Sequence, residues 1–98
     1  MDLRQEWTDN RLKLDVIGRL DTTTAPQLDG LLKEALERAD ELVLDFSQLN
    51  YISSAGLRVL LSAQKVMSRK GKMVLTGVQE AVMEVFEITG FSDILSFK

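Results

Sequence analysis

The chain contains no cysteine and no histidine, and its only proline is Pro26. Disulfides, thiolate metal sites and histidine-based catalytic triads are therefore excluded. It also lacks a Walker-type phosphate loop and a carboxylate pair at a recognisable spacing. We therefore expect a protein that is not an enzyme, with no catalytic residues, no metal site and no cofactor.

Long apolar runs and strong clusters of positive charge are also missing. No run approaches the roughly 20 apolar residues that cross a bilayer, and the first residues do not resemble a signal peptide. The 15 acidic and 12 basic residues are spread along the chain and give a net charge of -3. We expect a cytoplasmic protein that neither inserts into a membrane nor binds nucleic acid.

Apolar periodicity predicts a β-hairpin at the start of the chain. The segments Leu3 to Trp7 and Leu12 to Leu20 fit two strands, and the polar stretch Thr8 to Arg11 between them suits a turn. A helix follows, because Leu28, Leu32, Leu36 and their neighbours recur at three- and four-residue spacing. Thr24 with Gln27 is a capping-box pattern for the start of this helix.

The rest of the chain alternates between strand-like and helix-like segments. The predicted elements are a buried strand at Glu41 to Phe46, a helix at Ser54 to Lys70, a strand at Lys72 to Thr76, a helix at Gln79 to Thr89, and a last strand or packed tail at Ile94 to Phe97. The order β-β-α-β-α-β-α-β predicts a single α/β domain over residues 1–98, with a mixed sheet covered by helices.

Two hydroxyl-rich loops, Asp21 to Thr24 and Asn50 to Ser54, fall at the predicted carboxyl ends of strands, where ligands and partners tend to bind. Ser53 and Ser54 lie at the start of a predicted helix. The unpaired N–H groups there and the helix dipole would stabilise a phosphate. A serine at this place is also an ordinary helix cap.

The motifs of the chain resemble those of the STAS domain, in particular the small stand-alone anti-sigma factor antagonists of bacteria. The matching segments are Gly18-Arg-Leu-Asp21 for the pattern Gly-x-Leu-Asp, the strand Leu42-Val-Leu-Asp45, and Ser53-Ser54-Ala55-Gly56-Leu57 for the signature Asp-Ser-x-Gly-Leu. The resemblance covers nearly the whole chain. It implies a STAS-type mixed sheet of four to five strands, covered by three or more α-helices.

The resemblance implies a regulatory function. The unphosphorylated protein would bind an anti-sigma factor, itself a serine kinase, and so release a sigma factor. Phosphorylation would end this binding until a metal-dependent serine phosphatase removes the phosphate. The modified serine of the family falls on Ser54, and the usual aspartate before it is Ser53 here, which makes Ser53 a second candidate acceptor.

The same resemblance places a partner-binding face on two loops and the start of the second predicted helix. Its predicted residues are Asp21, Thr22, Thr23, Ser53, Ser54, Gly56 and Arg58. Gly56 permits close approach either by a neighbouring part of the protein or by a kinase loop, and Asp21 either ends its strand or lies beside Ser54. Two other functions remain open: a STAS subunit of a transporter or stress-signalling assembly, and a nucleotide-binding STAS module.

Overall fold

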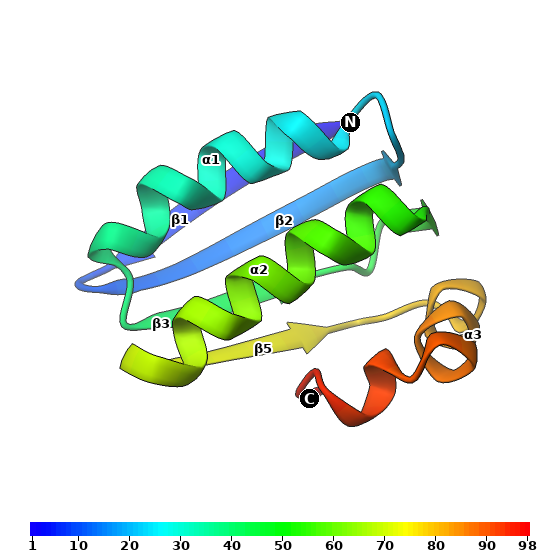
Figure 1. The fold of residues 1–98 in the computed structure, drawn as a ribbon. Helices are drawn as coiled ribbons and strands as arrows, with labels where there is room; N and C mark the ends of the chain where they lie inside the picture. The colour runs from blue at the N-terminus through cyan, green and yellow to red at the C-terminus, as the bar shows by residue number, and fades with distance from the viewer.

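A computed structural model describes all residues from Met1 to Lys98, and its sheet begins with the predicted hairpin (Figure 1). Strand β1 (Asp2–Thr8) pairs antiparallel with β2 (Arg11–Leu20). The turn between them contains Asp9 at a φ of 54°, a left-handed conformation that aspartate tolerates better than most residues. The predicted strand pair is confirmed, with each strand slightly longer than the apolar pattern indicated.

The long strand β2 pairs with a different neighbour in each of its halves. Its first half is parallel to β3 (Glu41–Asp45), which is in turn parallel to β5 (Lys72–Thr76). Its second half, Gly18 to Leu20, is parallel to β4 (Leu49–Ile52), after a register shift between Gly18 and Arg19. The result is a mixed sheet of five strands, which confirms the mixed sheet predicted from the sequence and lies within the four to five strands that the STAS resemblance implied.

Strand β4 was not predicted, because the sequence analysis assigned Asn50 to Ser54 to a loop. The strand has four residues and buries only its two ends, Leu49 and Ile52, while Asn50 and Tyr51 are exposed. Such a short segment shows no period-2 alternation of apolar and polar residues. Its strand conformation comes from pairing with β2, a tertiary contact that a local pattern cannot reveal.

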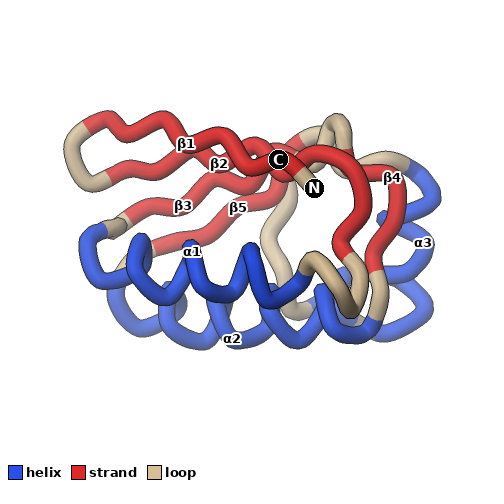
Figure 2. Tube along the Cα trace, turned by 90° about the horizontal axis from the view of Figure 1, so that it is seen from above, coloured by secondary structure: helices blue, strands red, loops and turns tan.

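The first two helices cover one face of the sheet (Figure 2). Helix α1 (Ala25–Arg38) and helix α2 (Ser54–Lys70) lie side by side there, whereas α3 (Glu80–Thr89) lies at the end where β4 is found. The core between sheet and helices is apolar, with no charged or polar residue among those fully buried. None of the helices is both long and apolar enough to cross a bilayer.

The C-terminal segment packs against the sheet without forming the last predicted strand. Gly90, at a φ of 82°, ends α3 as a left-handed cap, and a short 3-10 helix η1 (Phe91–Asp93) follows. Phe97 forms one isolated parallel bridge with Leu75, and its ring lies 5.7 Å from that of Phe86. The predicted α/β class is confirmed, and the observed order β-β-α-β-β-α-β-α differs only at β4 and at this tail.

Lys70, the last residue of α2, also closes the end of α1. Its ammonium group donates hydrogen bonds to the backbone carbonyl oxygens of Leu36 and Glu37. Carbonyl groups in the last turn of a helix have no partner within the helix, and a positive charge there complements the helix dipole. One side chain therefore joins the two helices at the end opposite Ser54.

We expect Lys70→Met to lower the free energy of unfolding by roughly 1 kcal/mol, because it removes the charge and both hydrogen bonds while keeping the aliphatic stem. Urea unfolding followed by circular dichroism measures this difference. The matched control is Lys65→Met, at an exposed α2 residue with no ion pair or side-chain hydrogen bond. Equal stability of the two variants would contradict the capping role of Lys70.

Candidate functional site

The carboxyl ends of β2 and β4 and the starts of α1 and α2 meet at one end of the molecule (Figure 1). The backbone N–H of Ser53 donates to the carbonyl of Leu20 across 2.9 Å, so the last residue of β2 is bonded to the residue that precedes α2. The two loops predicted from the sequence to bind a partner are therefore brought together at the same end.

The two serines at the start of α2 have different surroundings. Ser54 is the first helical residue and is exposed. Ser53 is the N-cap residue, but its side chain makes no capping hydrogen bond, and its Oγ has almost no accessible surface and no partner. The cap position thus falls on Ser53 rather than on Ser54, and the hydroxyl that solvent reaches is that of Ser54.

The start of α2 leaves backbone donors free. Leu57 is the first residue of the helix whose N–H reaches a carbonyl of the cap, donating to Ser53 across 3.0 Å. The preceding N–H groups, those of residues 54–56, have no partner inside the helix. Together with the positive end of the helix dipole, they form a region that favours negative charge.

Gly56, one of the predicted partner-binding residues, faces the interior of the protein. It is buried, and a Cβ atom at this position would lie 2.7 Å from Cγ of Leu20 and 2.9 Å from Cγ1 of Ile52. The sequence suggested close approach to Gly56 either by a neighbouring part of the protein or by a kinase loop. The structure shows the close approach within the protein. The absence of a side chain lets α2 begin directly above the ends of β2 and β4.

We expect Gly56→Ala to lower the free energy of unfolding by about 1–3 kcal/mol, because the added methyl group overlaps two side chains in a packed core. Gly30→Ala provides a matched control in α1, where a Cβ atom meets nothing within 4 Å. That control should raise the free energy of unfolding by up to about 1 kcal/mol through helix propensity. Thermal or urea unfolding that gave both variants the same sign would contradict this packing account.

The Asp21 loop is held by its own side chains. One carboxylate oxygen of Asp21 accepts hydrogen bonds from the N–H groups of Thr23, at 3.0 Å, and Thr24, at 3.1 Å, and from the Thr23 hydroxyl at 2.7 Å. The Asp21 carbonyl accepts from the N–H of Ala25 at 2.8 Å. Asp21 therefore organises the turn that leads into α1.

The capping box predicted for Thr24 and Gln27 is not formed. Thr24 makes no side-chain cap bond; its hydroxyl donates to the carbonyl of Arg19 across 2.8 Å and accepts from the N–H of Asp21. The Thr24 side chain is thus turned back toward β2. Asp21, three residues earlier, accepts from the N–H of Thr24, which the Gln27 side chain would satisfy in a capping box, and the N–H of Gln27 donates to the Thr24 carbonyl.

These hydrogen bonds make the Asp21 carboxyl a stronger acid. The Thr23 hydroxyl has the largest effect, and the N–H groups of Thr23 and Thr24 add to it, which together outweigh partial desolvation and lower the pKa of Asp21 to about 2. Because the folded-state pKa lies below the ordinary value, the ionised carboxylate favours the folded loop near neutral pH. This contribution is lost as the pH falls from about 4 through about 2.

We expect Thr23→Val to raise the pKa of Asp21 from about 2 toward its ordinary value of 3.8, because the strongest hydrogen bond to the carboxylate is removed. The shift should be incomplete, since the two backbone donors remain. Carboxyl carbon chemical shifts followed by NMR during acid titration measure it. Thr22→Val is the control, because the exposed Thr22 makes no bond to this carboxylate; the same titration curve for both variants would contradict the assignment.

Arg19 and Tyr51 form an exposed pair beside the Asp21 loop that the sequence analysis did not identify. The guanidinium carbon of Arg19 lies 4.2 Å from the centre of the Tyr51 ring, and its Nε lies 3.7 Å from the second carboxylate oxygen of Asp21. The two residues are register partners in β2 and β4. Because β4 was not predicted, no sequence signal placed Tyr51 opposite Arg19.

The remaining predicted site residues are at the surface. Thr22, Thr23 and Arg58 are exposed, with Arg58 one turn into α2 after Ser54. Arg58 forms no ion pair in the structure. This end of the molecule therefore presents hydroxyl and guanidinium groups. The carboxylate of Asp21, at the same end, is largely engaged in hydrogen bonds within its own loop.

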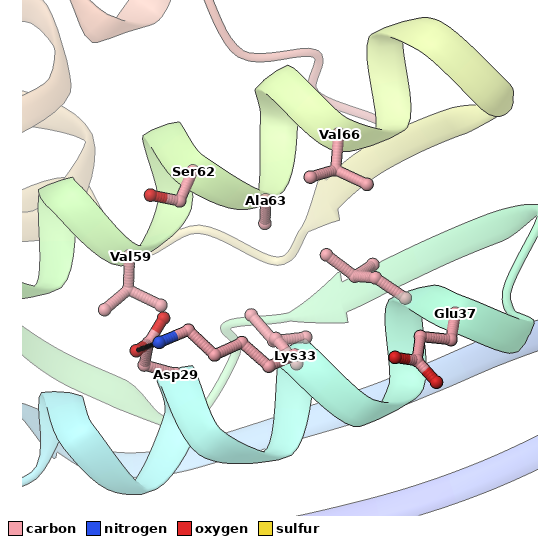
Figure 3. Close-up of a pocket in the computed structure, with 9 residues that line it drawn as sticks. Asp29, Lys33, Glu37, Val59, Ser62, Ala63 and Val66 are labelled. Atoms are coloured by element: carbon pink, nitrogen blue, oxygen red, sulfur yellow. Dashed lines mark ion pairs between the residues drawn. The ribbon is translucent and has the colours of Figure 1, made fainter.

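A groove of about 460 Å³ runs between α1 and α2 (Figure 3). Its floor is apolar, formed mainly by Leu32, Leu36, Val59 and Ala63. On its α1 side, Asp29 and Lys33 form an ion pair at 3.0 Å. Its polar donors are the side chains of Lys33 and Ser62, and no cluster of three metal-ligating side chains is present there.

The fold and these motifs are those of a known family. The family model described as Mlab, STAS domain, matches residues 3–96. The chain belongs to the STAS domain family, and the resemblance noted in its motifs is confirmed.

Among sequence relatives, the chain is 38% identical over 96 residues to a putative anti-sigma factor antagonist, BtrV, of Bordetella bronchiseptica, covering 96% of this chain and 83% of that protein. It is 34% identical over 104 residues to the anti-sigma-B factor antagonist of Listeria monocytogenes, covering 100% of this chain and 87% of the relative. Both alignments include the Asp21 loop and the start of α2.

Solved structures show the same fold. A putative anti-sigma factor antagonist from Thermotoga maritima superposes with a TM-score of 0.89 at 20% identity, covering 97% of this chain and 84% of the other. The unphosphorylated form of the anti-sigma factor antagonist SpoIIAA gives a TM-score of 0.78 at 16% identity, covering 99% and 87%.

Proposed function

We propose that this protein is an anti-sigma factor antagonist that is switched by phosphorylation of Ser54. In its unphosphorylated form it binds an anti-sigma factor with serine kinase activity, and this binding releases a sigma factor. The observation that carries the proposal is the exposed Ser54 hydroxyl at the open start of α2, in a chain whose relatives are named anti-sigma factor antagonists.

The accessibility of the two serines supports Ser54 as the acceptor. A kinase must bring the γ-phosphate of ATP in line with the attacking hydroxyl, so that oxygen has to be reachable from outside. The Ser53 Oγ has almost no accessible surface, whereas Ser54 is exposed. Modification of Ser53 would require the start of α2 to detach from β2 and β4.

The proposed switch acts through charge at a docking surface. A phosphoserine carries about -1.5 to -2 charges near neutral pH. Placed on Ser54, it is stabilised by the N–H groups at the start of α2, so the fold has no need to change. Repulsion or unpaired desolvation of about 1.4 kcal/mol lowers the affinity for a partner tenfold, and a few kcal/mol therefore release it.

The proposed docking surface consists of the Asp21 loop and the first turn of α2. It includes Asp21, Thr22, Thr23, Ser53, Ser54 and Arg58. Gly56 contributes from inside, because it allows α2 to begin above Leu20 and Ile52. In the same cycle, a metal-dependent serine phosphatase restores the unphosphorylated form.

To test this proposal, the purified protein is incubated with ATP and a kinase-type anti-sigma factor from the same organism, and the modified residue is mapped by mass spectrometry. We expect one phosphate per chain, on Ser54. Ser54→Ala should take up no phosphate, while Ser53→Ala should be phosphorylated like the parent protein, since the Ser53 hydroxyl makes no hydrogen bond.

The two alanine variants also serve as mutual controls, because each removes one hydroxyl from neighbouring positions. Phosphate uptake by Ser54→Ala equal to that of the parent would refute the assignment of the site. Absence of both phosphorylation and binding for the parent protein would refute the proposed function itself. Titration with ATP alone measures whether the protein binds nucleotide without a kinase.

A further inference from the structure

We propose that Arg19 is the residue that anchors the partner, by binding a carboxylate on the surface of the anti-sigma factor. This inference rests on the proposed function and adds to it the chemistry of the partner's contact surface. It assigns a binding role to Arg19, with Tyr51 as the residue that positions it.

The Arg19 guanidinium is held from two sides. Its carbon lies 4.2 Å from the centre of the Tyr51 ring, and its Nε lies 3.7 Å from the Asp21 carboxylate. An arginine that already lies on an aromatic ring and beside a carboxylate has less side-chain freedom to lose on binding. The pair is therefore arranged before a partner arrives.

The Asp21 carboxylate that holds Arg19 is itself fixed. Its other oxygen accepts hydrogen bonds from Thr23 and Thr24, the shortest three of them at 2.7 to 3.1 Å. The loop thus keeps this carboxylate in one position beside β2. Arg19 is held by a rigid neighbour rather than by a mobile surface side chain.

The outer side of the guanidinium remains open to a partner. The Arg19 side chain is 60% exposed and Tyr51 is 42% exposed. Arginine has five N–H donors in a planar fork, and its contact with Asp21 uses only the Nε side. The terminal N–H groups can therefore form a bidentate contact with a carboxylate. Arginine and tyrosine are also the residue types enriched at energetically important interface positions.

Arg19 and Ser54 belong to the same end of the molecule. Arg19 is the register partner of Tyr51, and Ser54 follows Tyr51 by three residues, a span of at most about 10 Å along an extended chain. The hydrogen bond from Ser53 to Leu20 keeps the two segments together. A partner that covers Ser54 therefore also reaches Arg19.

The charges at this end indicate an acidic partner surface. Arg19 and Arg58 are both exposed, and the segment from Phe46 to Gln79, which includes β4 and α2, has no acidic residue. With Asp21, whose carboxylate is engaged in its own loop, the two arginines give these three residues a net charge of +1. A phosphate of about -1.5 to -2 on Ser54 reverses that sign. Attraction for a carboxylate before phosphorylation thus becomes repulsion after it.

The test measures affinity for the same purified anti-sigma factor by isothermal titration calorimetry, using unphosphorylated protein without ATP. We expect Arg19→Glu to lose at least tenfold in affinity, with a smaller loss for Arg19→Gln and for Tyr51→Leu, which removes the ring under the guanidinium. Arg19→Lys should also bind more weakly than the parent, since lysine cannot form the bidentate contact.

The matched control is Arg69→Glu, which makes the same charge change at an exposed residue near the other end of α2. We expect it to bind within about twofold of the parent, and we expect the affinity of the parent to depend more steeply on salt than that of Arg19→Gln. Circular dichroism melting of each variant verifies that it is folded.

The outcomes distinguish this inference from the proposed function. If the parent protein binds and the Arg19 variants bind equally well, or lose no more than Arg69→Glu, Arg19 is not the anchor and the proposed function still holds. If the parent protein does not bind at all, the proposed function fails and this inference fails with it. Tighter binding of Arg19→Glu would show that the partner surface is basic and overturn the assignment.

Discussion

The contact of Gly56 with Leu20 and Ile52 fixes the start of α2 on the ends of β2 and β4, and the arrangement of the site follows from it. Because no Cβ atom separates them, the first turn of the helix lies directly on two strand ends. The bond from Ser53 to Leu20 then determines the direction in which the chain enters the helix. The Ser53 hydroxyl is enclosed by this packing, and the Ser54 hydroxyl is left outside.

Two different kinds of constraint hold the two loops of the site. The start of α2 is held by apolar packing and a backbone hydrogen bond, whereas the Asp21 loop is held by hydrogen bonds from two threonines to one carboxylate oxygen. The first constraint involves no titratable group. The second depends on an ionised group whose pKa is already near 2, so it persists at any pH at which the proposed kinase would act.

Local patterns in the sequence were sufficient for most of the fold. The apolar spacing of residues 28–39 and 54–70 located α1 and α2 because each helix buries one continuous stripe. Local patterns failed for β4, whose four residues become a strand only by pairing with β2. They also failed for the start of α1, where Asp21 rather than the Gln27 side chain accepts from the N–H of Thr24. In both places several hydrogen-bond partners are possible for the backbone, and the tertiary structure determines which one is used.

The difference between local patterns and tertiary contacts also explains which residues of the candidate site could be identified from the sequence. Ser54, Thr22, Thr23 and Arg58 were located from motif and loop position, and they are exposed as expected. Arg19 was not, because its significance depends on Tyr51, a residue of the strand that the pattern did not reveal. A guanidinium held against a ring and a carboxylate depends here on two backbone segments, the one that carries Arg19 and Asp21 and the one that carries Tyr51. It follows that the residues proposed to bind the partner are harder to predict than the residue proposed to be modified, since a modified serine requires only a helix start and exposure.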